Sequence, residues 1–443
     1  MAMTDPRNNQ SDQQDWFHYR SGELHVEDVC LTDIATEVPT PFYCYSAQAM
    51  RWAYSVLADA LRPIGVSICF AVKANSNIAV LRLLSDLGCG MDIVSGGELE
   101  RALAAGAPSS RIIFSGVGKT RAEIARALET GIHQINVESA AEIEAIAEVA
   151  RALGRRATIA LRVNPDVDAK THAKITTATK DSKFGIAIDD IPALYAKAAA
   201  RPELDVQGLA VHIGSQVQDL SPFRRAFASM AKLVTTLRQQ GLEVPRLDLG
   251  GGIGIAFGGN PGPDIAEYAA IIAETVGDLG SQLTVEPGRW LVGRAGLLVT
   301  ELLYLKDGQD SHVAIVDAGM NDLMRPALYD AKHPVLPFLE AKDTAGSSRY
   351  RIVGPICESS DDFGAYEGLG ELKAGDILAF DCAGAYGASM ASTYNSRDLV
   401  AEVLVDGDHF RTIRRRQTIH EVLELEDAGQ WHNGSAPARK AAG

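Results

Sequence analysis

The sequence predicts an α/β protein, a (β/α)8 barrel of the TIM type followed by a smaller all-β domain. Two observations support this fold class. Between residues 41 and 290 one pattern repeats: a short apolar run, a polar or glycine-rich turn, and an amphipathic segment with helical spacing. After residue 291 the pattern changes to short strand-like runs separated by turns. We therefore expect a barrel at 41–290 and a β-sandwich or barrel-like domain formed by 291–443 together with 1–40.

Eight apolar runs in the first region are candidate strands. They cover residues 67–74, 90–95, 111–116, 134–138, 157–164, 206–214, 246–252 and 282–288. Strands that alternate with helices imply a parallel sheet with right-handed crossovers. Eight such units in a region of about 250 residues match the usual size of a closed (β/α)8 barrel. A helix predicted over 46–61 precedes the first strand, and the fifth unit carries a long insert, 165–188, of the kind that often forms a functional loop.

The second region contains candidate strands at 297–305, 311–317, 350–357, 376–381 and 398–405. A hairpin turn at 406–408 leads into a further strand at 409–416. Residues 15–40 are candidates for additional strands of this domain. The tail, 429–443, is expected to be frayed.

Composition excludes several classes of function. The 443 residues are 46% hydrophobic and 22% charged, which is typical of globular proteins, and the formal net charge is −15. Such an acidic surface repels phosphate backbones, so we expect no nucleic-acid partner. No apolar run reaches 18 residues and the N-terminus lacks an apolar signal core, so we expect a cytoplasmic protein without membrane contact. The six cysteines form no CxxC pair, and we expect no metal site.

Polar residues follow the ends of the predicted barrel strands. They are Lys73, Asp92, Ser95, Ser115, Glu138, Arg162, Asn164, His212, Ser215, Gly250, Gly251, Gly252, Glu286 and Arg289. In a parallel barrel the strand ends share one face, and that face carries the active site. Each residue alone is weak evidence, but together they predict a site at this face.

Lys73 and the three glycines suggest a cofactor. A lysine at a strand end most often extends to solvent, but at a barrel mouth desolvation can remove its proton and allow a Schiff base. Three glycines after the seventh strand exceed what a turn needs and allow backbone N–H groups to close on a phosphate. Together they suggest pyridoxal phosphate. Glu286 would then pair with the pyridine nitrogen or, alternatively, form a salt bridge with Arg289, and His212 would stack on the ring or be an ordinary core histidine.

Longer motifs give a resemblance to a known family. The segments 70–75, 92–98, 183–185, 212–216, 250–252 and 286–289 resemble the alanine-racemase-like, fold type III pyridoxal-phosphate decarboxylases. The segments 317–329, 354–361 and 382–387 are similar to those of the diaminopimelate decarboxylase branch. The resemblance extends from about residue 38 to 425. Ala178, where glycine is expected, and the bulky Trp290 depart from the family pattern.

The resemblance implies a role for each site residue. Lys73 forms the Schiff base with pyridoxal 5'-phosphate, His212 stacks on its ring, and Glu286 faces the ring nitrogen. The phosphate is held by Ser215, Gly252, the backbone of 286–289 with Gly288, and Tyr386. The far end of the substrate is gripped by Arg289, Arg325, Tyr329, Glu358 and Tyr386. Cys357 is the catalytic proton donor and enters with Glu358 from the partner subunit, which implies a homodimer with shared active sites.

The implied reaction is decarboxylation of meso-2,6-diaminopimelate to L-lysine and carbon dioxide, the last step of lysine biosynthesis. Two arginines suit the distal carboxylate of this substrate by bidentate pairing. The runner-up is a decarboxylase of another basic amino acid, such as ornithine or arginine. A racemase on the same fold and a non-catalytic pyridoxal-phosphate carrier are weaker alternatives, the latter because such carriers typically lack a β domain.

Overall fold

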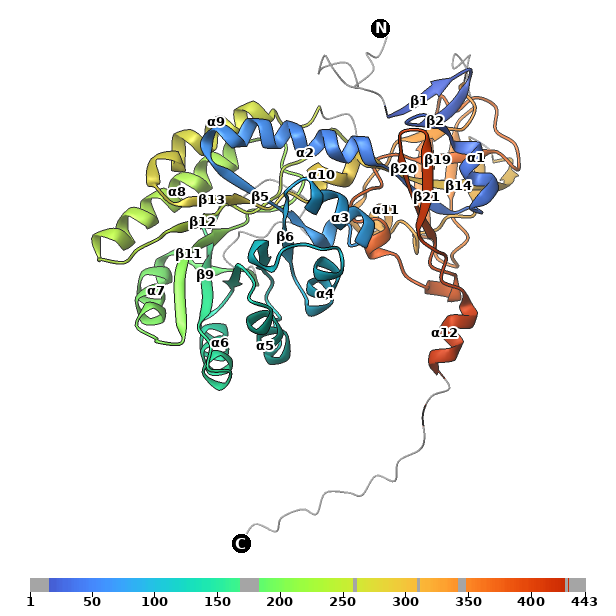
Figure 1. Ribbon diagram of the computed structural model, residues 1–443. Coiled ribbons are helices and arrows are strands. Elements are labelled where there is room, and N and C mark those ends of the chain that lie inside the picture. Colours follow the sequence, from blue (N-terminus) through green and yellow to red (C-terminus); the bar gives the residue numbers. More distant parts are fainter. Residues whose placement is uncertain are drawn as a thin grey trace.

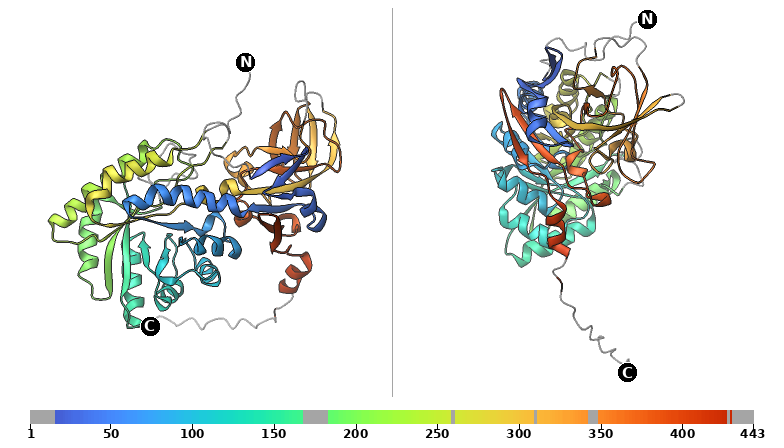
Figure 2. Two further views of the ribbon diagram at one scale, coloured as in Figure 1. Left: turned by 45° about the horizontal axis from the view of Figure 1, so that its top comes forward. Right: turned by 90° about the vertical axis from the view of Figure 1, so that its right-hand side faces the viewer.

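The computed structural model describes residues 16–167, 183–257, 261–308, 311–341, 348–426 and 429. Within these ranges the chain forms two units, a barrel surrounded by helices and a β-rich unit. The two lie side by side (Figure 1; Figure 2, left). Most of the long insert after the fifth strand, including Ala178, and nearly all of the tail lie outside the described residues. No helix in these ranges is both long and apolar enough to cross a bilayer.

Eight parallel strands form the barrel, as predicted. They are β5 (Val66–Ala71), β6 (Gly90–Ile93), β7 (Ile112–Phe114), β8 (Gln134–Val137), β9 (Ala157–Asn164), β11 (Leu204–Val211), β12 (Arg246–Asp248) and β13 (Gln282–Val285). Each pairs in parallel with the next, β8 pairs with β9, and β13 pairs with β5, which closes the sheet. A two-residue strand, β10 (Ile186–Ala187), pairs with the end of β9. The predicted barrel is confirmed.

Helices cover the outside of the barrel (Figure 1). They are α2 (Ala47–Leu61), α3 (Ile78–Asp86), α4 (Gly96–Ala104), α5 (Arg121–Thr130), α6 (Ala140–Ala152), α7 (Ile191–Ala199), α8 (Ser221–Gln239) and α9 (Ile265–Val276). Local sequence explains where several begin, because Ser46, Ser95 and Ser139 each accept a backbone N–H of the first turn. The apolar face of each helix is buried against the strands, as helical spacing requires.

The β-rich unit is built on one large mixed sheet. It contains β4 (Phe42–Ser46), β14 (Gly296–Lys306), β15 (His312–Val316), β16 (Val335–Pro337), β17 (Tyr350–Val353), β18 (Asp362–Tyr366), β19 (Ile377–Phe380), β20 (Ala401–Asp406) and β21 (His409–Arg414). Our strand prediction missed β16 and β18, and it also missed the terminal helix α12 (Ile419–Glu426).

The start of the barrel region differs from our expected boundary at residue 41. Strand β4 pairs antiparallel with β14 and parallel with β20, so it belongs to the large sheet of the β-rich unit. The barrel region begins after it, with α2. Our prediction contained no strand at 42–46 and assigned these residues to the barrel region.

The N-terminal segment forms a small sheet of its own. It consists of β1 (Phe17–Arg20), β2 (Glu23–Val26) and β3 (Val29–Cys30), followed by α1 (Leu31–Glu37). Its apolar side chains pack in one cluster with Phe42, Val299 and Val403 of the large sheet. The segment therefore completes the β-rich unit by packing against it and through β2, whose Leu24 N–H donates to the Phe338 carbonyl at 2.9 Å, just after β16.

A buried carboxylate links the two units. Glu402 on β20 is 2% exposed and accepts hydrogen bonds from Tyr45 Oη (2.6 Å) and from Asn77 Nδ2 (2.8 Å), at the start of α3. It also pairs with Arg414 Nε at 3.1 Å. A buried charge needs such a set of partners, because an unpaired one is strongly destabilising.

Tyr45→Phe is expected to lower the free energy of unfolding by about 1–3 kcal/mol, because it removes one donor from buried Glu402. Urea denaturation of the variant and the wild type measures the difference. Tyr304→Phe is the control, since Tyr304 is 67% exposed and its change should stay within about 0.5 kcal/mol. Equal losses in the two variants would contradict this role for Glu402.

Candidate active site

Lys73 lies at the barrel mouth, on the short helical turn Val72–Ala74 that follows β5. Its Nζ is 3.0 Å from Oδ2 of Asp92, a fully buried residue on β6. Burial lowers the pKa of Lys73, but the opposing interactions, led by the charge of Asp92, more than compensate, and the net pKa is raised. In this structure the Lys73 amine is therefore held as an ammonium, and its Schiff base stays a prediction. Asp92 holds the ammonium through this contact.

Two further carboxyl groups lie beside this pair. Glu286 follows β13 and Asp248 ends β12; they are 7% and 2% exposed and are hydrogen-bonded to each other. Burial, followed by the charges of Asp248 and Asp92, raises the pKa of Glu286 well above its usual range. Two buried carboxyl groups in contact cannot both ionise readily, so the pair retains a proton.

Hydrogen bonds indicate which of the two carboxyl groups is ionised. Oδ2 of Asp248 accepts from Asn136 Nδ2 at 2.8 Å, and Oδ1 accepts from the Gly250 N–H at 2.9 Å. Donors to both oxygens favour a carboxylate at Asp248 and leave the proton on Glu286. Oε1 of Glu286 and Oδ1 of Asp92 are buried and lack a hydrogen-bond partner within the described residues. These orphan acceptors suit a group that brings its own N–H or positive charge.

The glycine loop is tightly enclosed by backbone. A Cβ added to Gly250 would lie 2.2 Å from the Val211 carbonyl oxygen, and one on Gly251 would lie 2.0 Å from that of Glu286. Gly252 has φ +107° and faces a similar clash with the backbone after β11. A Cβ added to Gly288, in the neighbouring loop, would come into tight contact with the side chains of Ala71, Ala74 and Tyr386. Only glycine allows these loops to approach each other so closely.

His212 follows β11 and faces the same loop. Its Nδ1 accepts the Gly251 N–H at 3.1 Å, so the ring proton belongs on Nε2. Burial, and then the charges of Arg162 and Lys73, lower the pKa of His212 well below its usual value. The ring is therefore neutral at physiological pH.

Arg289 begins the short helix α10 (Arg289–Val292) and is 7% exposed. Its guanidinium lies over the Tyr386 ring at 4.8 Å, and Nη2 donates to Ser215 Oγ at 3.4 Å. Tyr386 has φ +56°, an unusual conformation for a non-glycine residue, and its N–H donates to the Ala74 carbonyl at 2.7 Å. No ion pair joins Glu286 to Arg289 in the described chain, so the salt-bridge alternative for these two residues is wrong.

Arg325 begins α11 (Arg325–Tyr329) in the β-rich unit and is 6% exposed. Burial, followed by repulsion from Arg289, lowers the pKa of Arg325 to about 9, so it stays charged at neutral pH. Tyr329 lies close enough to interact with both arginines. Neither arginine forms an ion pair with a carboxylate in the described ranges. Two neighbouring buried cations without counter-ions favour an anionic ligand.

Cys357 and Glu358 lie on the exposed surface of the β-rich unit. The Cys357 N–H donates to Asn395 Oδ1 at 3.1 Å, and the Glu358 carboxylate bonds to Tyr394. No hydrogen bond or ion pair of the described chain joins either residue to Lys73. Of the twelve site residues that the resemblance implies, the structure of one chain thus leaves these two at the surface, away from Lys73.

Two other features bear on the predictions. The bulky Trp290 is accommodated, because its Nε1 donates to the Ala53 carbonyl of α2 at 2.9 Å.

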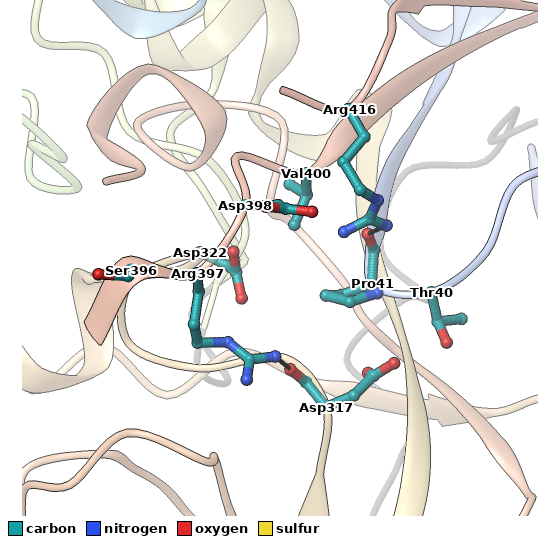
Figure 3. A pocket seen from close by; sticks show the side chains of 9 residues that line it. All are labelled: Thr40, Pro41, Asp317, Asp322, Ser396, Arg397, Asp398, Val400 and Arg416. Carbon is teal, nitrogen blue, oxygen red and sulfur yellow. Dashed lines mark hydrogen bonds between the residues drawn. The ribbon is translucent and has the colours of Figure 1, made fainter. Parts of the chain in front are cut away.

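A cavity of about 370 Å³ lies in the β-rich unit, where Arg397 and Arg416 point toward Asp317 and Pro41 (Figure 3). None of the predicted site residues lines this cavity. In the described ranges no group of three potential ligands could hold a metal ion.

Sequence reasoning missed Asp248, Asn136 and His333. Asp248 and Asn136 lie inside predicted strands, where a single polar residue gives no periodic signal. Asp248 stands two residues before the glycine loop, and that position was the one available hint. His333, which lies 3.3 Å from Arg325, follows a helix too short to be recognised from spacing.

Comparison with known proteins gives a consistent result. Residues 48–293 match the family described as "Pyridoxal-dependent decarboxylase, pyridoxal binding domain". The diaminopimelate decarboxylase of Pseudomonas fluorescens is 48% identical over 93% of this chain and 99% of its own length.

Solved structures agree. Helicobacter pylori diaminopimelate decarboxylase in complex with L-lysine has a TM-score of 0.86 and 38% identity, over 90% of this chain and 100% of that one. The M. jannaschii enzyme, also with L-lysine, has a TM-score of 0.88 and 34% identity, over 94% of this chain and 98% of its own. With its barrel, its β-rich unit and its lysine at the barrel mouth, this chain belongs to the pyridoxal-dependent decarboxylases, and within them to the diaminopimelate decarboxylase family.

Proposed function

We propose that this chain uses pyridoxal 5'-phosphate to decarboxylate meso-2,6-diaminopimelate at one end, giving L-lysine and carbon dioxide. The observation that carries the substrate choice is the pair of buried arginines, Arg289 and Arg325, which have no carboxylate partner within the described residues. The relatives named for this activity and those solved with L-lysine support the same choice.

The residues at the barrel mouth fit the cofactor. Lys73 would bind its aldehyde, and the contact with Asp92 would hold the side chain at the barrel mouth. The backbone of the glycine loop and of Gly288, together with Ser215 and Tyr386, would hold its phosphate. Once bound, pyridoxal phosphate supplies an electron sink for the pair released when carbon dioxide leaves.

Glu286 and His212 would control the cofactor ring from its edge and its face. Orphaned Oε1 of Glu286 is available to the ring nitrogen, and burial beside Asp248 makes this carboxyl a stronger base than usual. A strong base holds a proton at the ring nitrogen over a wider pH range. Neutral His212 packs without adding a charge.

The substrate end of the site discriminates by charge. Arg289, Arg325, Tyr329 and Tyr386 would bind the distal carboxylate, and Glu358 the distal ammonium. Ornithine and arginine lack the distal carboxylate, so either substrate would leave two buried cations unpaired, at a cost of several kcal/mol. A decarboxylase of those amino acids therefore fits this site less well. A carrier without catalysis would have no use for such a clamp.

Cys357 would donate the proton that replaces carbon dioxide, acting in the active site of the partner subunit of a homodimer. Its exposed position on this chain supports the proposal, because a residue that completes a neighbouring site must reach the surface.

The decisive experiment combines turnover with mapping. Purified protein supplied with pyridoxal 5'-phosphate should release L-lysine and carbon dioxide from meso-diaminopimelate and leave L-ornithine nearly untouched. Borohydride reduction followed by peptide mapping should place the cofactor on Lys73. Label on another residue, or release of carbon dioxide from ornithine at a comparable rate, would refute the proposal.

Asp248→Asn removes a negative charge beside Glu286 and should lower the pKa of that carboxyl. The ring nitrogen should then lose its proton more readily, and the high-pH limb of the kcat profile should move down by about one unit. Asp322→Asn is the control, a buried carboxyl whose pKa burial raises to about 7 and which lines the cavity of Figure 3. If the high-pH limb of the kcat profile does not move in Asp248→Asn, Asp248 does not set the basicity of Glu286.

Shared sites predict complementation between inactive subunits. Lys73→Ala and Cys357→Ala proteins, mixed and allowed to exchange subunits, should regain about a quarter of wild-type activity, because half of the dimers are mixed and each has one intact site. Each variant incubated alone is the control. Mixed dimers that form but stay inactive would show that Cys357 acts within its own chain, and an active Cys357→Ala control would show that it has no catalytic role.

A further inference from the structure

A fully buried histidine lies directly behind Arg325. His333 Nε2 is 3.3 Å from Arg325 Nη1, and His333 Nδ1 is 2.9 Å from the main-chain oxygen of Asp381. The His333 carbonyl accepts a hydrogen bond from Tyr366 Oη at 2.9 Å. The Phe257 ring packs edge-to-face on the imidazole at 5.1 Å. These contacts fix the position of His333 through its main-chain carbonyl, its ring and both ring nitrogens.

The two nitrogen contacts define the protonation state of the ring. A carbonyl oxygen can only accept, so Nδ1 must carry the proton that it donates to Asp381. A guanidinium can only donate, so Nε2 must accept from Arg325. Burial, and then the charge of Arg325, lower the pKa of His333 to about 3, which agrees with a neutral ring at physiological pH.

The contact with His333 occupies one edge of the guanidinium and leaves the other open. Nε of Arg325 is buried and has no hydrogen-bond partner within the described residues. The Phe257 ring lies 5.4 Å from the guanidinium carbon. Nε and Nη2 form the side-on edge of an arginine, where two parallel N–H groups match the two oxygens of a carboxylate.

We propose that His333 is a positioning residue that fixes Arg325 through Nη1 and so presents the Nε–Nη2 edge to the distal carboxylate of the substrate. An acidic residue in this place would also orient the arginine, but it would neutralise the charge that binds the substrate. A neutral acceptor orients Arg325 and leaves its full charge for the ligand. His333 thereby contributes to selection of amino acids with a second carboxylate without contacting them. This inference rests on the proposed function, since it takes Arg325 as part of the substrate clamp.

Two conservative variants separate the two contacts of the ring. In His333→Asn the amide reaches the position of Nδ1, so a donor to Asp381 remains and the acceptor for Arg325 is lost. In His333→Gln the amide oxygen reaches the position of Nε2, so the acceptor for Arg325 is restored and the donor to Asp381 is lost. Steady-state kinetics with meso-diaminopimelate, together with melting temperatures, are measured for both. Arg325→Ala, alone and combined with His333→Asn, supplies the reference.

For His333→Asn we expect KM to rise about tenfold or more with kcat little changed, because the distal clamp binds the substrate and the transition state alike. His333→Gln should remain near the wild-type KM. In the Arg325→Ala background His333→Asn should have no further effect on KM, since the two residues act through one contact. A normal KM in His333→Asn, equal defects in both variants, or additive effects with Arg325→Ala would overturn the proposal and make His333 a purely structural residue.

The inference can be tested without variants and separately from the proposed function. A neutron structure of the wild-type protein should show deuterium on His333 Nδ1 and none on Nε2, and deuterium on Nε2 would overturn the proposal even if the variants fail to fold. Wild-type protein that does not turn over diaminopimelate would refute the proposed function. Wild-type turnover with an unaffected KM in His333→Asn would refute the positioning role alone.

Discussion

Closure of the barrel between β13 and β5 is the constraint on which the site depends. These strands are the last and the first of the barrel, and their pairing brings residues about 200 positions apart in sequence into contact. The Ala71 N–H donates to the Pro287 carbonyl at 3.1 Å, which ties the loop of Glu286 to the loop of Lys73. A register shift between these strands would separate the Glu286 carboxyl from the Lys73 amine. It would also displace Gly288, whose missing Cβ leaves space between the two loops.

Charge is distributed over the site in a way that matches a ligand with two different ends. Three carboxyl groups, Asp92, Asp248 and Glu286, lie together on neighbouring strand ends of the barrel, with Lys73 as the cation paired to one of them. Arg289 and Arg325 lie together without carboxylate partners in the described chain. The first group stabilises positive charge and protonated nitrogen, and the second stabilises anions. Burial strengthens both effects, because the same charges would be screened by water at the surface.

The part of this arrangement that repeats along the chain could be predicted from the sequence. The barrel strands were located within a few residues, because apolar runs and helical spacing recur eight times, and the strand ends then indicated Lys73, His212 and Glu286. Strand β4 was missed, because its partners, β14 and β20, are more than 200 positions away in sequence. Asp248, Asn136 and His333 went unnoticed because their importance comes from hydrogen bonds to other side chains, which are far away in sequence for Asp248 and Asn136 and start outside any regular element for His333. Such contacts leave no pattern in a single sequence, and the exposed Cys357 could be singled out only through family resemblance.

The site divides its tasks between the two units, and this division explains why the chain needs both. The barrel alone, which is the part that matches the pyridoxal-binding family, provides Lys73, Asp92, His212 and Glu286. The β-rich unit adds Arg325 and Tyr386, and its loop is fastened to the barrel mouth by Asn75 Nδ2 donating to the Gly384 carbonyl at 3.1 Å and by Ser389 Oγ donating to the Lys73 carbonyl at 3.0 Å. A barrel without this unit would keep the groups that bind a cofactor and would lack the second arginine of the clamp. Substrate choice can therefore change through the β-rich unit while the chemistry of the barrel stays the same, because the groups that serve each task lie on different parts of the chain.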